Sequence, residues 1–515
     1  MKRYRLIALL LLATSAWSCN KFLEEYSLNE LRPGSVIDLQ QLMIGEAYPF
    51  TGFFAPYLEL LTDNVTSNFP TRSIEQQIVI LMKGEGPFLW RYDMFETMQE
   101  RGIANSNSYE LFYRRVMVCN VVLDHLDGVV GSLEEKDKIK GEALALRAYC
   151  YFMLVNLYGQ PYNAPGVDVN TTPGVPLILA SAVKDEYPTR ASVGTVYEQI
   201  EKDLLEAEEL LAELGKETSK WRVTDLFVYN LLSRVYLYEE RWEEAVAYAT
   251  KVLQRSPLLL DLHKLTNSSN NFPTTNVFTS NVYDINNVEL IWGYSSPLEH
   301  SFAFNASMIP AYSRTSPAPY AVSPDLLACY EYDDVSTTNR KDLRPHFYYI
   351  GYGAMASRYR VSNLKIIREG GTGPTKGMRV AEAYLNRAEG NARLFLATGD
   401  GAYRTAALAD LNYLRGHRYD KRNVAYVPVE IADAEELLQF CLDERRRELS
   451  YEEHRWFDLR RSGMPKIIHE FKFIAEQNPV VDSLVQGDER YVLPIPAVAL
   501  SKNPGLESNP SNTPR

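Results

Sequence analysis

Hydrophobic residues recur at helical spacing through much of the first half of the chain. Apolar positions stand three or four residues apart in residues 107–128, 134–158 and 192–214. This spacing puts them on one face of an α-helix. The first segment closes at Gly128, and Ser192 stands where a helix N-cap is expected. The pattern therefore predicts three long helices.

Two further segments each predict a pair of helices joined by a short turn. They are residues 224–254 and 378–417, and in the first of them Ala245 and Ala249 share one helix face with larger apolar residues. Small residues at this spacing let two helices approach closely, as in tetratricopeptide repeats, where helix pairs stack and share a core. We therefore predict a mostly α fold on a tetratricopeptide-like scaffold of helical pairs.

The helical pattern breaks in residues 50–100 and again in residues 256–375. The second region is rich in Asn, Ser, Thr, Pro and Tyr, with short strand-like runs at 288–296 and 346–352. Long irregular stretches on a rigid scaffold tend to carry function. We therefore expect the functional residues in these two regions, among long loops and a few short strands.

The N-terminus has the order of a secretory signal. Three basic residues precede a short apolar run at residues 6–13, and small residues then lead to Cys19. The run is too short to cross roughly 30 Å of hydrocarbon as a helix. A Cys at this place predicts a lipoprotein: a signal peptide at 1–18, an acylated Cys19 and a polar tether through residue 30. A plain secretory peptide with an incidental Cys is the alternative.

Charge and cysteine usage narrow the function classes. The 515 residues carry a net charge of −12, which becomes −15 once the three positive charges of residues 1–18 are removed. No basic stripe offsets this charge, so nucleic acid and anionic membrane surfaces are poor partners. The spacing of the other cysteines excludes a zinc knuckle or a CxxC redox pair and leaves their disulfide state open; they are Cys119, Cys150, Cys329 and Cys441. The first two lie in apolar helical patterns and are expected to be buried thiols.

Motifs of common catalytic sites are absent from the sequence. There is no HExxH, no GxSxG, and no complete phosphate loop or dinucleotide fingerprint. These absences predict no catalytic metal site and no nucleotide or dinucleotide cofactor. A glycosidase-type carboxylate pair stays open at this point, because such pairs are assembled in space rather than in sequence.

The densest charge pattern lies in residues 444–461, ERRRELSYEEHRWFDLRR. Opposite charges three residues apart face each other on a helix and contribute a few tenths of a kcal/mol each. The pattern holds three such pairs: Glu444 with Arg447, Glu452 with Arg455, and Asp458 with Arg461. From the residues alone it predicts one or two charged helices, with Trp456, Phe457 and Leu459 on the apolar side.

As a string, residues 444–461 resemble the C-terminal signature of the SusD/RagB family of outer-membrane nutrient-binding lipoproteins. Residues 491–510, YVLPIPAVALSKNPGLESNP, resemble the closing segment of that family. Residues 142–162 and 379–393 resemble the family at matching places. The resemblance therefore spans nearly the whole mature chain.

The resemblance implies a single SusD-like domain at 31–515, with its helical scaffold mainly in 105–255 and 378–465. The ligand face would come from 50–100 and 256–375. The implied function is non-catalytic: a lipid-anchored outer-membrane protein, facing the cell exterior, that captures glycan or oligosaccharide. It would deliver this ligand to a SusC-like TonB-dependent transporter and act as a lid on it.

Aromatic side chains in the two irregular regions are the candidates for ligand contact. A flat ring can cover the C–H face of a sugar, while Asp, Asn and Arg bond its hydroxyls. The candidate ligand-binding residues are Asp63, Asn64, Trp90, Tyr92, Phe95, Trp292, Tyr294, Tyr312 and Tyr320. Since the chain has 34 Tyr, packing in a core is the alternative for each ring.

Three other functions compete with glycan capture. The same machine could carry peptides, in which case backbone hydrogen bonds would matter more than rings and alanine at Trp90 or Trp292 would change little. A hydrolase on a helical scaffold would turn over a glycan or peptide. A purely structural repeat scaffold would bind no nutrient at all.

Overall fold

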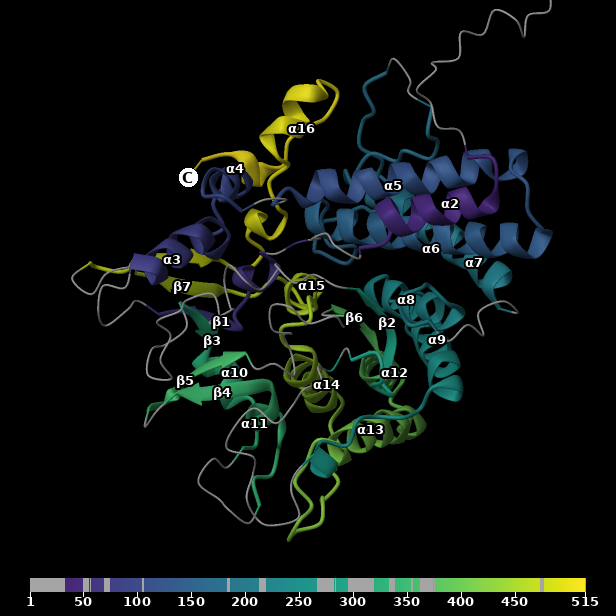
Figure 1. Cartoon of the computed structure of the whole chain (residues 1–515). Helices are drawn as coiled ribbons and strands as arrows, with labels where there is room; N and C mark the ends of the chain where they lie inside the picture. Colours follow the sequence, from purple (N-terminus) through teal and green to yellow (C-terminus); the bar gives the residue numbers. More distant parts are fainter. Residues whose placement is uncertain are drawn as a thin grey trace, which may run out of the picture.

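The computed structural model describes residues 33–49, 55, 57–68, 75–103, 106–182, 186–212, 219–265, 282, 284–294, 319–332, 339–352, 355–361, 374, 376–472 and 477–514. The described part is mostly helical with a few short strands. Long helices group on one side and most strands on the other, with two helices from the C-terminal signature between them (Figure 1).

The three long helices predicted in the first half are confirmed. They are α5 (Ser108–His125), α6 (Leu133–Tyr158) and α7 (Val193–Leu211). Helix α6 begins with a capping box, in which Ser132 Oγ accepts the Glu135 N–H and the Glu135 carboxylate accepts the Ser132 N–H. Ser192 caps α7 as predicted, accepting from the Thr195 N–H. Local capping and the apolar faces together fix where these helices start.

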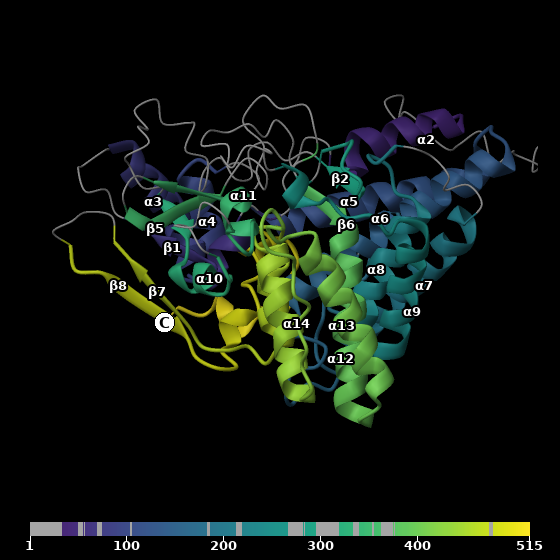
Figure 2. The ribbon, with the colours of Figure 1, turned by 90° about the horizontal axis from the view of Figure 1, so that it is seen from below.

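Both predicted helix pairs are also confirmed: α8 (Asp225–Tyr238) with α9 (Trp242–Arg255), and α12 (Val380–Thr398) with α13 (Gly401–Gly416). Ala245 and Ala249 are fully buried on α9. Helix α12 comes so close to α9 that a Cβ at Gly390 would lie 2.7 Å from a methyl carbon of Val246. Small residues thus permit the predicted close helix contact, and the detailed likeness to tetratricopeptide repeats stays a prediction. Figure 2 shows α12, α13 and α14 side by side.

The remaining helical elements are short, except for α3 and α14. They are α2 (Val36–Leu42), η2 (Met43–Ala47), η3 (Leu58–Leu61), α3 (Glu75–Phe88), α4 (Met94–Glu100), η4 (Leu126–Gly128), η5 (Leu262–Leu265), α10 (Pro324–Ala328), α11 (Arg344–Tyr348), α14 (Ala434–Leu449), α15 (Arg455–Arg461), η7 (Glu489–Tyr491), α16 (Ala497–Lys502) and η8 (Pro510–Asn512). Among the described residues, no helix has both the length and the apolar character that a membrane span needs.

The strands form four separate antiparallel pairs: β1 (Val65–Ser67) with β3 (Tyr320–Val322), β2 (Leu290–Tyr294) with β6 (Lys376–Arg379), β4 (Tyr349–Tyr352) with β5 (Met355–Val361), and β7 (Ile467–Phe471) with β8 (Val480–Leu484). The first two pairs join segments that are far apart in sequence. The predicted strand at 288–296 is confirmed as β2. The run at 346–352 begins instead in α11, because Pro345 stands in the first turn of a helix, where its fixed φ is favourable.

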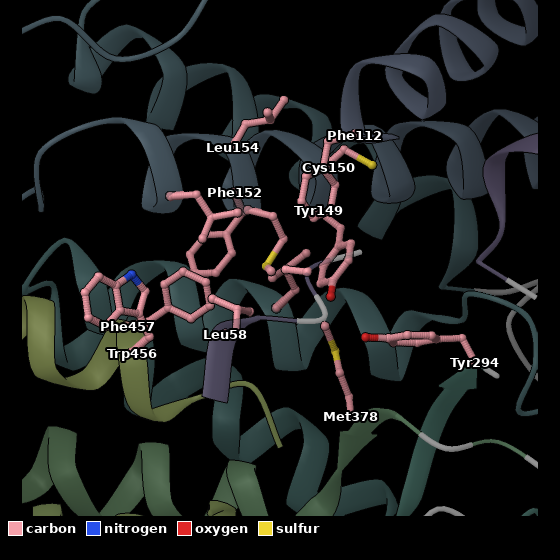
Figure 3. Packing of buried hydrophobic residues seen from close by; sticks show 14 of the residues in the cluster. Leu58, Phe112, Tyr149, Cys150, Phe152, Leu154, Tyr294, Met378, Trp456 and Phe457 are labelled. Carbon is pink, nitrogen blue, oxygen red and sulfur yellow. The ribbon is translucent and has the colours of Figure 1, made fainter. Parts of the chain in front are cut away.

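Apolar side chains from α5, α6, η3 and α15 meet in the core, where Phe112, Tyr149, Phe152, Leu58 and Phe457 pack together (Figure 3). Cys119 and Cys150 are buried here as free thiols, as predicted. Burial raises the pKa of the Cys119 thiol well above its usual value and that of the Cys150 thiol to about 12. Both thiols therefore stay protonated and serve as packing residues.

The C-terminal signature folds as two helices, α14 and α15, separated by a break at 450–454. Tyr451 and Glu453 in this break have left-handed backbone angles, with φ of 61° and 67°. Two of the three predicted ion pairs form, Glu444 with Arg447 and Asp458 with Arg461, each at 2.8 Å.

The third predicted pair is wrong. Glu452 lies in the break rather than on a helix, and its carboxylate binds Arg379 at 2.7 Å. Arg455 turns the other way and binds Asp63, also at 2.7 Å. The left-handed residues beside Glu452 end the helical spacing on which the prediction rested.

The charged side chains of the C-terminal signature do not all face solvent. Its carboxylates bind buried arginines that come from other elements. We call this group the ionic hub, and its side chains are at most 8% exposed. It contains five carboxylates and five arginines: Asp342, Glu289, Glu444, Glu448 and Glu452, with Arg344, Arg379, Arg415, Arg418 and Arg447. Charges balance within the hub, which is the condition under which buried ions are tolerated.

Glu448 lies at the centre of the ionic hub. Its carboxylate is 2.9 Å from Arg418, 3.1 Å from Arg379 and 3.3 Å from Arg344. Burial alone would raise the pKa of Glu448, but Arg418 and Arg379 more than reverse this and hold it well below its usual range. The carboxylate is therefore ionised throughout the neutral range. It neutralises arginines from three separate parts of the chain, namely α11, β6 and the residues that follow α13.

Replacing Glu448 with Gln should lower the free energy of unfolding by about 3–5 kcal/mol, because it leaves buried arginines without their counter-charge. Urea unfolding followed by circular dichroism measures this. Glu435→Gln, an exposed change on the same helix, is the control and should cost at most about 1 kcal/mol through the helix dipole. Equal losses in the two variants would show that the hub adds nothing to stability.

Candidate ligand-binding surface

Asp63 and Asn64 follow η3, and their side chains face the C-terminal signature. The Asp63 carboxylate accepts two hydrogen bonds from Arg455, at 2.7 and 2.8 Å, and lies 3.1 Å from Arg446. Asn64 is fully buried and its side-chain oxygen accepts from Arg446 at 2.9 Å. Burial raises the pKa of Asp63, but the two arginines outweigh it and leave the pKa lowered. In this arrangement both residues position α14 and α15.

Trp90 and Phe95 pack inside the protein. The Trp90 indole donates to the Leu61 carbonyl at 3.0 Å and stacks on the His469 ring with centroids 4.3 Å apart. Phe95 packs edge-on against Tyr57 at 5.3 Å. These contacts give both rings a structural role, and their predicted ligand contact stays a prediction.

Tyr92 is 42% exposed, between α3 and α4. Trp90 before it has a positive φ of 47°, an uncommon conformation for a large residue. The chain turns there, so the Trp90 ring lies inside while Arg91 and Tyr92 face solvent. Asp93 beside them is half-buried. Tyr92 is therefore an exposed ring with a cation and a carboxylate as its neighbours in sequence.

Tyr320 is fully buried on β3, and its hydroxyl donates to the Leu81 carbonyl at 2.7 Å. Its ring lies so close to Gly84 that a Cβ there would be 2.6 Å from a ring carbon. The remaining candidate, Tyr312, lies outside the described residues, as does Cys19.

Trp292 and Tyr294 come together in a pocket, which we call the β2–β6 pocket. It is lined by Tyr149, Met153, Arg234, Trp292, Tyr294, Gly377, Met378, Glu452, Glu453, His454 and Phe457. Figure 3 shows the Tyr149 and Tyr294 hydroxyls and the Met378 side chain converging from different elements. The empty space between these residues is about 320 Å³, and part of this space is open to solvent. Only about one or two water molecules fit among the side chains.

Glu453 is a polar residue of the pocket that bonds to one of the predicted residues, Tyr294. Its Oε2 accepts from the Tyr294 hydroxyl at 2.9 Å, and Lys376 Nζ lies 3.8 Å from its Oε1. Its backbone N–H donates to Glu59 at 3.0 Å. His454 is the neighbouring ring, and burial, with Arg234 and Arg445 nearby, holds its pKa well below 6.5. At neutral pH the His454 ring is therefore uncharged.

The lining residues from the break, Glu452 to His454, were not among the predicted ligand residues. These three residues belong to the C-terminal signature, and that signature was the feature of the sequence that could have pointed to them. Helical spacing instead predicted that they lie on a charged helix. Tyr149 and Met378 were also missed, because each stands in an apolar pattern typical of a core. Within the described ranges, no three His, Cys, Asp or Glu side chains gather as metal ligands.

Comparisons with known proteins agree on one family. A family model described as "Starch-binding associating with outer membrane" matches residues 21–237, and the model of the SusD family matches residues 330–511. SusD-like protein P25 of Formosa agariphila is 24% identical over 308 residues, which cover 57% of this chain. The match spans about half, 51%, of that relative's own length.

Solved structures share the fold over nearly the full length. A SusD-like carbohydrate binding protein from Bacteroides vulgatus matches with a TM-score of 0.63 at 21% identity, covering 94% of this chain and 98% of its own. A SusD superfamily protein from Bacteroides thetaiotaomicron matches with a TM-score of 0.65 at 21% identity, covering 92% of this chain and 100% of its own. These likenesses confirm the predicted fold class.

Glu59, which accepts a hydrogen bond from the pocket residue Glu453, should make the stability of the fold depend on pH. Burial raises the pKa of this η3 carboxyl to about 7, against the opposing effect of Lys376. The folded state therefore keeps a proton that the unfolded chain releases above about pH 4.5. Stability should fall as pH rises from about 4.5 to 7, by up to ~3 kcal/mol from this group.

Glu59→Gln should flatten this part of the profile, because Gln cannot titrate. Urea unfolding at pH 5 and at pH 7.5 gives the difference for each variant. Glu209→Gln, exposed on α7, serves as control and should keep the wild-type slope. Parallel profiles for wild type and Glu59→Gln would contradict the assignment.

Proposed function

Because this chain belongs to the SusD/RagB family, we propose that it is a non-catalytic cell-surface lipoprotein that captures glycan or oligosaccharide and delivers it to a SusC-like TonB-dependent transporter. The family is a carbohydrate-binding, nutrient-uptake family associated with the outer membrane. The observation that carries the proposal is the match of two models of this family to both halves of the chain.

Tyr92 is the aromatic candidate whose place on the surface best supports sugar contact. A flat ring exposed beside Arg91 and Asp93 offers an apolar face for sugar C–H groups and charged groups for the hydroxyls. We propose that the β2–β6 pocket and the other predicted residues also contribute to the ligand surface; these residues are Asp63, Asn64, Trp90, Phe95, Trp292, Tyr294, Tyr312 and Tyr320.

The proposed lid role sets the strength of binding. A protein that must pass its ligand on to a transporter gains nothing from very tight capture. Dissociation constants between about 1 mM and 1 μM, or roughly −4 to −8 kcal/mol, suffice. Several weak contacts to one polymeric glycan add to the retention.

Calorimetric titration of the chain from Asn20 onward tests the ligand class. All the described elements lie after residue 32, so this form keeps every one of them. A panel of polysaccharides, oligosaccharides and peptides should give saturable heat with a glycan and no product. Heat from peptides alone would assign the protein to peptide uptake, and turnover of any ligand would make it a hydrolase.

Tyr92→Ala should weaken binding of the glycan found in this panel about three- to tenfold, because one stacking surface is lost. The same titration measures it. Tyr187→Ala is the matched control, since Tyr187 is an exposed tyrosine that packs near Gly505 instead. Equal affinities for Tyr92→Ala and wild type would remove Tyr92 from the ligand surface.

We also propose that Cys19 carries the lipid anchor, with a signal peptide at 1–18 and a tether at 19–30. In cells fed a radiolabelled fatty acid, the wild-type chain should take up label and fractionate with the outer membrane. Cys19→Ser should do neither, whereas Cys329→Ser should behave as wild type. Labelling of the Cys19→Ser chain would contradict this assignment.

A further inference from the structure

Two buried polar atoms in the lining of the β2–β6 pocket have no hydrogen-bond partner among the described residues. One is the indole nitrogen of Trp292, a residue that is 1% exposed. The other is Oε1 of Glu453, whose other oxygen accepts from Tyr294. One atom is a donor and the other is an acceptor.

Such atoms are rare in proteins because they are costly. An unpaired buried donor or acceptor costs about 1–3 kcal/mol, so nearly all of them find a partner in the protein or in bound water. Within the described chain, Lys376 Nζ at 3.8 Å is too far from Glu453 Oε1 for a hydrogen bond. The pocket therefore suits an occupant that can accept from the indole and donate to the carboxylate.

The other charged groups of the lining are already paired. Arg234 makes two hydrogen bonds to Glu382, at 2.6 and 2.7 Å. Glu452 receives two from Arg379, at 2.7 and 2.8 Å. Since these pairs neutralise each other and His454 is uncharged, the pocket has no surplus arginine for an anion. Lys376 beside Glu453 also makes it a poor site for a cation.

Size limits the occupant further, since about one or two water molecules fit. A hydroxyl group meets every requirement, because it donates one hydrogen bond, accepts others and is as small as water. Rings of Tyr149, Tyr294 and Phe457 in the lining can cover the carbon that carries it.

We propose that the β2–β6 pocket is a hydroxyl subsite, in which Trp292 Nε1 donates to, and Glu453 Oε1 accepts from, one hydroxyl group of a polyhydroxylated ligand. Water takes the same two hydrogen bonds when ligand is absent. This inference rests on the proposed function for the identity of the ligand, but not for the chemistry of the pocket.

Gly377 explains how the backbone leaves room for this subsite. Its φ is 152°, and a Cβ at this position would lie within 2 Å of the Trp292 carbonyl oxygen. Only glycine allows β6 to come this close to β2. The backbone of Trp292 therefore lies close against β6, and its indole packs against the rings of Tyr149, Phe227 and Tyr294.

A crystal structure of the chain from Asn20 onward, with and without glycerol as a small hydroxyl probe, tests the pocket directly. We expect a water on Trp292 Nε1 and Glu453 Oε1 without glycerol, and a glycerol hydroxyl in its place with it. Water that glycerol never displaces would reduce the pocket to a structural water site and overturn the proposal. A dry pocket, or a protein acceptor on the indole, would overturn it as well.

Trp292→Phe and Trp456→Phe form a matched pair for the ligand itself. Trp456 is equally buried at 1% and its indole nitrogen also lacks a partner among the described residues, but it stacks on Tyr491 and does not line the pocket. Trp292→Phe should weaken binding of the glycan identified by calorimetry about five- to tenfold. Trp456→Phe should change it less than twofold.

Equal effects of the two substitutions would overturn the subsite. Should no glycan bind the wild-type chain, the proposed function fails, and the glycerol structure still decides whether the pocket takes a hydroxyl. Thermal unfolding of both variants confirms that each is folded before titration.

Discussion

The fold depends on buried carboxylates that several arginines share. Glu444 and Glu448, one turn apart on α14, bind arginines from α11, α13 and the chain around β6. Each ion loses its hydration in this interior, so none is tolerated unless its counter-charges are in place. The segments that carry the hub must therefore come together as a set, although they are spread along the chain from Glu289 to Glu452.

The same constraint shapes the candidate ligand surface. Beyond Glu448 the chain breaks at two left-handed residues, and this break brings Glu453 to Tyr294 and sends Arg455 to Asp63. The segment 444–461 thus contributes both to the buried ionic hub and to the wall of the pocket. Most charged side chains of this segment form ion pairs within the protein, so its charge pattern reflects a structural role.

Helical periodicity and cap residues predicted the scaffold well, because a helix is specified by contacts within a few residues. The predicted Glu452–Arg455 pair failed because two left-handed residues, which spacing does not reveal, interrupt the helix. The sequence also could not predict which of the candidate aromatic side chains are buried. Trp90 and Tyr92 are two residues apart in the same loop, yet one ring stacks on His469 and the other is 42% exposed. Only long-range packing decides between them.

Strand pair β2–β6 shows how the hub and the pocket are coupled. An isolated pair of strands is marginally stable in water, but this pair ends in a buried ion pair. Arg379 is the last residue of β6, Glu289 directly precedes β2, and their side chains lie 2.5 Å apart. Arg379 also holds Glu452, and Glu452 and Glu453 both line the pocket. The ions that hold the strands together therefore also hold the segment that carries Glu452 and Glu453 against the strand pair that carries Trp292. A substitution in the hub that the fold survives would reach the pocket through this connection, without touching any bound ligand.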